Sequence, residues 1–456
     1  MSDILEQLYN HCDPLTPAQP KDYTDLSEVR GGDTFIHTFC EELKRSRSRV
    51  HTLFTGHSGC GKSSELKKLE FELDTDAPQH SHSRYFPVYI DAAEYVDIFD
   101  ASTEEILLAV VTEIAAQFRE KAQIELKNTT LANLMSGVVE IARSVKPSKA
   151  TLDLKLIKLE LGLNRADPSI RKKVREHLIP RTTTLLDEIN ALFIEARTRL
   201  REKTDANGNQ VYHDFILILD NLEKIQTLGG RAQGEASYRA LFIEGGQQFI
   251  RLNCHAIFTV PLSLARAAGK ELMQLYGNEP IVLSNVKVEE RGSYKRWDAG
   301  RNALRALLAE RCHPYTVEQC MDKDALDELL TYSGGHVRQF LNFVRRSTLY
   351  TDAAPIPLDA MQRAISQAVP SYSVGVADAT WEMLAALELS DDQEWDTSDE
   401  TKRDLMEGLF VLEYVNGDRK QNFLNKSMPW YAVHPIVRAL NPFQDAVKVL
   451  RKVSPA

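Results

Sequence analysis

The sequence has few cysteines, and their spacing argues against clustered thiol chemistry. Six cysteines are scattered over 456 residues, and no two form a CxxC pair. This spacing supports neither a disulfide framework nor a zinc site, so we expect a reducing, cytoplasmic environment. No apolar run approaches the roughly 18 residues that a membrane-spanning helix needs. The first residues lack a basic segment followed by an apolar one, so we expect no secretory signal and no membrane partner.

Basic charge is also scarce. Lys and Arg total 55 against 65 Asp and Glu, which gives a net charge of -10. A whole-chain electrostatic attraction to nucleic acid is therefore not expected, although one basic face remains open. Hydrophobic residues at 43% and charged residues at 26% exclude wholesale disorder. At roughly 100–200 residues per domain, the length predicts about two to four domains.

Five short apolar runs predict the strands of a parallel sheet. The first run ends in a glycine-rich turn, and an amphipathic stretch from Ser64 to Leu73 follows it. The order strand, glycine loop, helix, strand opens an α/β fold. The later runs are continuously apolar, as in strands buried on both faces. The five runs are residues 50–55, 85–91, 215–219, 256–260 and 280–284.

Residues 102–206 are interpreted as an insertion between two core strands. Ser102 has the spacing of a capping box, which predicts a helix after it. Residues 152–162 alternate like a half-buried strand, and a charged helix is predicted over 169–203 with a break at Pro180. An insertion of this size favours a dedicated protein partner.

The strongest motif is Gly56-His-Ser-Gly-Cys-Gly-Lys62-Ser63, which fits the P-loop pattern GxxxxGK[ST]. Glycines let backbone N–H groups converge on phosphate oxygens at the start of a helix. Lys62 is predicted to bind the β- and γ-phosphates of ATP, and the Ser63 hydroxyl to bind Mg²⁺. The strand before and the helix after argue against a chance glycine turn. The residues expected to bind nucleotide here are Gly56, His57, Ser58, Gly59, Cys60, Gly61, Lys62, Ser63 and Ser64.

Three further residues are candidates for catalysis at the ends of strands. Asp220 follows a buried strand and is predicted to hold Mg²⁺, although such an Asp also caps turns. Glu223 is our candidate for activating water. The alternative is a solvated surface Glu, and it stays open because many ATPases place the catalytic Glu directly after the Asp, where this chain has Asn221. Thr259 is a candidate to bind the γ-phosphate or the attacking water, and it is equally typical of ordinary strand packing.

A double glycine, Gly334-Gly335, precedes an amphipathic helix with Arg338 in its first turn. A cation at that end opposes the helix dipole, so contact with phosphate explains it better than helix stability does. The alternative is a surface arginine.

Together these features resemble an AAA+ or STAND-type ATPase, similar to the bacterial relatives of origin-recognition-like ATPases, over about residues 23–348. The resemblance implies that Arg338 is the sensor 2 arginine and that Thr259 occupies sensor 1, where AAA+ proteins more often have Asn. It also implies that Val29 and Arg30 line the adenine pocket. A neighbouring subunit often supplies an arginine finger in this family. The candidates for that finger are Arg251, Arg266 and Arg291.

The C-terminal part predicts two helices and then two short strands, which resembles a winged-helix domain. Its loop, 416–427, carries three basic residues against one acidic residue, which suits either phosphate contacts or protein docking. His434 is interpreted as a packed structural histidine. The predicted fold class is therefore an α/β P-loop NTPase with a parallel sheet core, a helical lid and a C-terminal winged helix. The predicted domains are a lead-in over 1–30, an ATPase core over 31–295, a lid over 296–350 and a winged-helix-like domain over 370–445.

Three functions remain open. The first is an ATPase whose cycle drives assembly or remodelling of a protein partner, with ATP and Mg²⁺ as cofactors. The second is a slow nucleotide-gated switch, for which the resemblance suggests bacterial stress or antiphage defence. The third is an initiator-like ATPase that binds DNA through the winged helix, which the acidic net charge disfavours.

Overall fold

The computed structural model describes most of the chain and divides it into two compact units. Unit 1 comprises Met1–Thr38, Gly56–Lys67 and Val282–Ala456, and unit 2 comprises Phe39–Thr55 and Lys68–Ile281. The described residues are 3–32, 35–75, 84–98, 101–127, 136–138, 140, 168–225, 234–416 and 428–453. The predicted strand over 152–162 and most of the loop over 416–427 lie outside them.

A five-stranded sheet in the order β2-β3-β4-β1-β5 confirms the predicted α/β architecture. The pairs β1–β4, β2–β3 and β3–β4 are all parallel. Each of the five predicted runs is a strand, with ends shifted by at most a few residues. The strands are β1 His51–Gly56, β2 Arg84–Asp91, β3 Tyr212–Asp220, β4 His255–Thr259 and β5 Ile281–Leu283.

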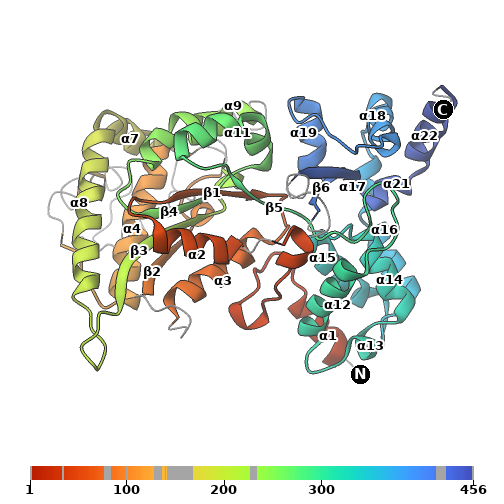
Figure 1. The fold of residues 1–456 in the computed structure, drawn as a ribbon, viewed down its shortest axis with the longest axis horizontal. Coiled ribbons are helices and arrows are strands. Elements are labelled where there is room, and N and C mark those ends of the chain that lie inside the picture. The colour runs from red at the N-terminus through yellow and green to blue at the C-terminus, as the bar shows by residue number, and fades with distance from the viewer. Residues whose placement is uncertain are drawn as a thin grey trace. The chain divides into compact units, whose positions relative to one another are not determined.

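The helices of unit 2 pack on the sheet and share its apolar core. Helix α4 lies against β2 and α8 against β3, while α9 contacts α11 (Figure 1). The capping box at Ser102 is present, with Glu105 as its partner. The predicted break at Pro180 is a 3-10 turn between α7 and α8. The helices are α4 Thr103–Lys121, α7 Pro168–Leu178, α8 Thr182–Arg201, α9 Gly234–Arg239, the π-helix η7 Ala240–Glu244, α10 Gly246–Phe249 and α11 Leu262–Tyr276; α2 Phe35–Arg45 and α3 Lys62–Asp74 span the division between units.

Unit 1 is mainly helical, and the range 296–350, predicted as a helical lid, contains α12, α13, α14 and α15. Helix α1 packs against α12 and α15, and α16 packs against α14 and α15. The two predicted C-terminal strands form an antiparallel pair, β6 Val411–Val415 with β7 Pro429–Val433. The helices are α1 Asp3–His11, α12 Asp298–Cys312, α13 Val317–Cys320, α14 Lys323–Tyr332, α15 Val337–Ser347, α16 Leu358–Ser366, α17 Val369–Ser373, α18 Asp378–Leu389, α19 Glu400–Glu407, α21 Pro435–Arg438 and α22 Asn441–Val453.

Short 3-10 helices connect these elements. They are η1 Pro20–Asp22, η2 Ser27–Arg30, η3 Ala92–Glu94, η4 Ile179–Arg181, η5 Leu222–Lys224 and η8 Thr348–Tyr350. None of the described helices combines the length and apolar character that crossing a bilayer requires.

Candidate functional site

The loop between β1 and α3 adopts a shape that its glycines permit. Gly56, Gly59 and Gly61 all have positive φ, at 152°, 91° and 112°. A Cβ on Gly59 would stand 2.6 Å from the Cβ of Arg338, and one on Gly56 would stand 2.4 Å from the Leu283 carbonyl oxygen. The motif glycines are therefore required by both backbone conformation and close packing.

Five consecutive carbonyl groups of this loop, those of residues 56–60, accept hydrogen bonds from protein donors. The Lys62 ammonium donates to the carbonyls of Gly56 at 3.0 Å and His57 at 3.3 Å, and only 5% of the Lys62 residue is exposed. Donors from outside the loop bind the remaining three carbonyls. Because a trans peptide points its N–H away from its C=O, the opposing amides belong to residues 57–61. Among these, the Cys60 amide bonds within the loop, to His57 oxygen at 3.1 Å.

Arg30 reaches the loop from the N-terminal segment. Its guanidinium donates to the Cys60 carbonyl at 2.6 Å and lies 3.5 Å from the Glu65 carboxylate. Tyr23 also donates to Glu65, at 2.8 Å. Burial raises the pKa of Glu65, while Arg30 and Tyr23 oppose that rise. Arg30 and Val29 are both buried, and this contact places Arg30 against the loop.

The turn before α15 holds the Ser58 carbonyl. The His336 side chain donates from Nε2 to the Ser58 carbonyl at 2.8 Å and accepts at Nδ1 from the Gln339 amide at 3.3 Å. These two bonds define one neutral tautomer. Burial is the main cause that lowers the pKa of His336 to about 4, and nearby cations including Arg338 add to it.

Arg338 itself binds the loop twice. Its backbone N–H donates to the Gly59 carbonyl at 3.0 Å, and its guanidinium donates to the Ser58 hydroxyl at 3.0 Å. Its Nε is buried without a hydrogen-bond partner among the described residues. The predicted sensor 2 arginine therefore contacts the loop between β1 and α3 directly, and its Nε has no hydrogen-bond partner among the described residues.

The C-terminal strands also contact the loop. The buried His57 side chain accepts a hydrogen bond from the Glu413 backbone of β6 at 3.0 Å. The Tyr414 hydroxyl donates to the Gly334 carbonyl at 2.6 Å, so β6 binds both the loop and the double-glycine turn. His434 is fully buried, as predicted, and donates from Nε2 to the Gln339 side chain at 2.6 Å.

In unit 2, the ends of β2 and β3 gather two carboxylates. Asp220 is fully buried and pairs in register with Asp91. The Tyr89 hydroxyl donates to Asp220 at 2.5 Å, and burial together with this carboxylate raises the pKa of Tyr89. Asn221 has φ of 61° and donates from its side chain to Asp91 at 2.7 Å. Asn221, the residue after Asp220, is thus neutral, and its side chain stabilises the turn through its bond to Asp91.

Thr259 supports the same turn. Its hydroxyl accepts from the Leu222 amide at 3.0 Å and is 0% exposed. Glu223 follows Leu222 on η5 and is half-buried. The structure therefore gives Thr259 a local task, that of fixing the turn that carries Glu223.

The remaining predicted residues are placed as follows. Ser63 lies half-buried in the first turn of α3, and the Ser64 hydroxyl accepts from the Ala18 amide at 3.0 Å. Of the finger candidates, Arg251 lies 3.9 Å from Asp187, and Arg291 donates to a backbone carbonyl. Arg266 is half-buried in α11.

Sequence reasoning missed four residues at these sites: His336, Asp91, Tyr89 and Glu65. Two of them carried a signal. Asp91 ends its strand as Asp220 does, and His336 stands just before the helix, where a side-chain acceptor caps the first turn. Tyr89 and Glu65 had none, because their partners are distant in sequence. No cluster of three metal-ligating side chains occurs within the described ranges.

No protein-family model matches the chain, and no curated protein is similar enough to count as a relative. Two solved structures align along most of it. The Walker-type ATPase of Pyrococcus abyssi is 16% identical, with 94% of this chain and 98% of that one covered, at a TM-score of 0.46. Cdc6p of Pyrobaculum aerophilum is 13% identical, with 93% and 98% covered, at a TM-score of 0.33. Similarity at this level carries no functional argument, so function is argued from the residues.

Proposed function

We propose that this chain binds ATP with Mg²⁺ at the loop between β1 and α3 and hydrolyses it. The observation that carries the proposal is the set of five carbonyls, 56–60, all bonded to protein donors. Their opposing amides lie at the start of α3 and would be the donors for phosphate oxygens. The Lys62 ammonium lies against the same loop, where it donates to the carbonyls of Gly56 and His57.

The roles of the other residues follow from the chemistry of their groups. Asp220 would hold Mg²⁺ with the Ser63 hydroxyl, an assignment that rests on the sequence motifs. When bound, Mg²⁺ supplies charge neutralisation on the phosphate oxygens. Glu223 would orient or deprotonate water, and Thr259 would keep its turn in place.

A slow nucleotide-gated switch is the second candidate function. The neutral Asn221 directly follows Asp220, so no carboxylate stands at that position. The loop is also bonded to β6 through His57 and to α15 through Ser58. Such contacts favour an output in which the nucleotide state changes how the lid and C-terminal strands are held. Turnover would then matter less than occupancy.

Partner choice remains a proposal from the sequence. We expect self-association or a protein partner that responds to ATP, as in a stress or antiphage system. DNA binding through the predicted winged helix depends on loop 417–427, which lies outside the described residues.

The test of nucleotide binding is Lys62→Ala, measured by calorimetry with ATP and Mg²⁺. Loss of most ATP affinity is expected, because the substitution removes a cation from the phosphate site. Lys323→Ala is the matched control, since Lys323 is exposed at the start of α14. Equal ATP affinity in all three proteins would refute the proposed site.

Steady-state and single-turnover phosphate release distinguish the two functions. An ATPase that drives a cycle gives sustained release. A slow switch gives about one phosphate per protein and then retains ADP. DNA added to the same assay tests the initiator-like alternative.

A further inference from the structure

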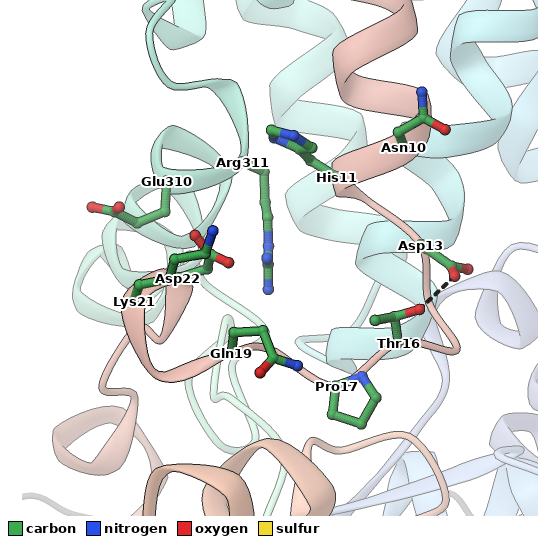
Figure 2. Close-up of a pocket in the computed structure, with 10 residues that line it drawn as sticks. All are labelled: Asn10, His11, Asp13, Thr16, Pro17, Gln19, Lys21, Asp22, Glu310 and Arg311. Carbon is green, nitrogen blue, oxygen red and sulfur yellow. Dashed lines mark hydrogen bonds between the residues drawn. The ribbon is translucent and has the colours of Figure 1, made fainter. Parts of the chain in front are cut away.

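Unit 1 contains a recess away from the nucleotide loop. It has a volume of about 240 Å³ and is bounded by the end of α1, the segment that follows it and the last turn of α12 (Figure 2). At about 30 Å³ per water molecule, it holds roughly eight waters. The space therefore suits a molecule the size of a single amino acid.

A guanidinium group occupies the centre of this recess. The Arg311 side chain extends from α12 into it, towards Gln19 and Pro17 (Figure 2). Its Nε is buried and has no hydrogen-bond partner among the described residues. A guanidinium carries five N–H donors in a planar fork that matches a carboxylate. A buried, unsatisfied donor is costly, and a bound oxyanion removes that cost.

The rim of the recess carries charges of both signs. Lys21 contributes a cation, and Asp22 and Glu310 contribute carboxylates. No ion pair joins any of these three to another described residue within 4.0 Å. Asp13, the other acidic wall residue, is already paired with Arg345 of α15 at 2.6 Å. A multiply charged anion would be repelled by Asp22 and Glu310, whereas a zwitterion satisfies both signs.

We propose that this recess binds a small zwitterionic carboxylate of the amino-acid class. The ligand carboxylate binds the Arg311 fork, and its ammonium group faces Asp22 and Glu310. Lys21 and the Gln19 amide border the rest of the molecule. The site uses none of the residues assigned to nucleotide, so it stands or falls independently of the proposed ATPase function.

Binding to the full chain is measured by calorimetry with each of the twenty standard amino acids in turn. Acetate, methylammonium and inorganic phosphate are the reference probes. We expect one or a few amino acids to bind saturably at one site, at least about ten-fold more tightly than acetate or methylammonium. Arg311→Gln should weaken that binding about ten- to a hundred-fold, the range of a charge-assisted pair.

Two further variants make the result specific. Arg363→Gln, an exposed arginine on α16, is the matched control and should leave affinity unchanged. Asp22→Asn should weaken amino-acid binding while leaving acetate binding unchanged. Because Asp22 lies at the rim, this variant keeps the test valid if circular dichroism shows that Arg311→Gln does not fold. The proposal is overturned if no amino acid binds, if phosphate binds in preference, or if neither Arg311→Gln nor Asp22→Asn lowers affinity.

Discussion

His336 makes the junction between α15 and the nucleotide loop sensitive to acid. Its ring donates to Ser58 and accepts from Gln339, and both bonds require the neutral tautomer. A proton on Nδ1 would convert that acceptor into a donor facing the Gln339 N–H. Burial, which disfavours the charged ring, is the main cause that lowers the pKa of His336 to about 4 from an ordinary 6.5.

The size of the effect follows from these two pKa values. Between pH 6.5 and pH 4 the unfolded chain binds a proton at this residue that the folded chain does not. As the pH is lowered through this range, the free energy of unfolding therefore decreases by up to about 1.4 kcal/mol per pH unit. The His336 contribution lost is about 2 kcal/mol at pH 5 and about 3 kcal/mol at pH 4 and below.

Urea unfolding followed by tryptophan fluorescence measures the free energy of unfolding of unit 1. All four tryptophans, at 297, 381, 395 and 430, lie in unit 1, which also contains His336. The variants are His336→Asn, whose amide oxygen replaces the Nδ1 acceptor, and His336→Gln, whose amide nitrogen replaces the Nε2 donor. Neither residue titrates, so each variant should lose about 2 kcal/mol less than wild type between pH 7 and pH 5.

Comparison with the variants is needed because other groups in unit 1 also titrate. Burial lowers the pKa of His434, which acts in the same direction as His336, while two carboxyls act in the opposite direction. Burial raises the pKa values of Glu65 and Glu388, and a carboxyl with a raised pKa favours the folded state as pH falls. These groups are common to all three proteins and cancel in the difference. Parallel stability curves for wild type and both variants would refute the assignment of acid sensitivity to His336.

Three further predictions concern the proposed site. Glu223→Gln should retain ATP binding in calorimetry but slow phosphate release, since the amide has a similar shape and little basicity; unchanged release would transfer the role to another carboxylate. Arg338→Ala should weaken ATP-promoted self-association or partner binding by a coupling on the order of 1–3 kcal/mol. Light scattering with ADP and with a non-hydrolysable ATP analogue measures this response. The prediction is contradicted if the wild-type protein has the same mass in every nucleotide state and binds no partner more tightly with the analogue. Thr259→Val should destabilise unit 2 by about 1–3 kcal/mol, because it leaves the buried Leu222 N–H unpaired, whereas Thr259→Ser should lose less in thermal unfolding.

Local patterns were enough to predict the strands, the glycine-rich turn between β1 and α3, and the capping box. Each of these depends on residues that are close in sequence. Continuous apolar runs mark β1, β3 and β4, and the helix after Ser102 follows from a spacing of three residues. The double glycine also located the turn before α15 correctly.

The contacts that define the site were beyond the sequence because they join distant segments. His57 and Glu413 are 356 residues apart, and His336 and Ser58 are 278 apart. No periodicity records such a pairing. The helix dipole and the family resemblance both predict that Arg338 contacts phosphate, and neither reveals that its backbone also binds Gly59.

Different donors hold the carbonyls of residues 56 and 57, here called the inner pair, and those of residues 58 to 60, here called the outer three. This difference bears on how the proposed nucleotide would be sensed. Lys62 holds the carbonyls of residues 56 and 57, while α15 and Arg30 hold those of residues 58 to 60. In the proposed role, a triphosphate that draws the Lys62 ammonium towards itself removes this donor from the carbonyls of Gly56 and His57, while the Cys60 amide still donates to His57. The outer three stay bonded, so the loop keeps its shape while its charge distribution changes. In the proposed coupling, one route runs from Ser58 to α15, where Arg338 donates to the Ser58 hydroxyl and its Nε has no hydrogen-bond partner among the described residues. The bond between His57 and the Glu413 backbone is a second route, to β6.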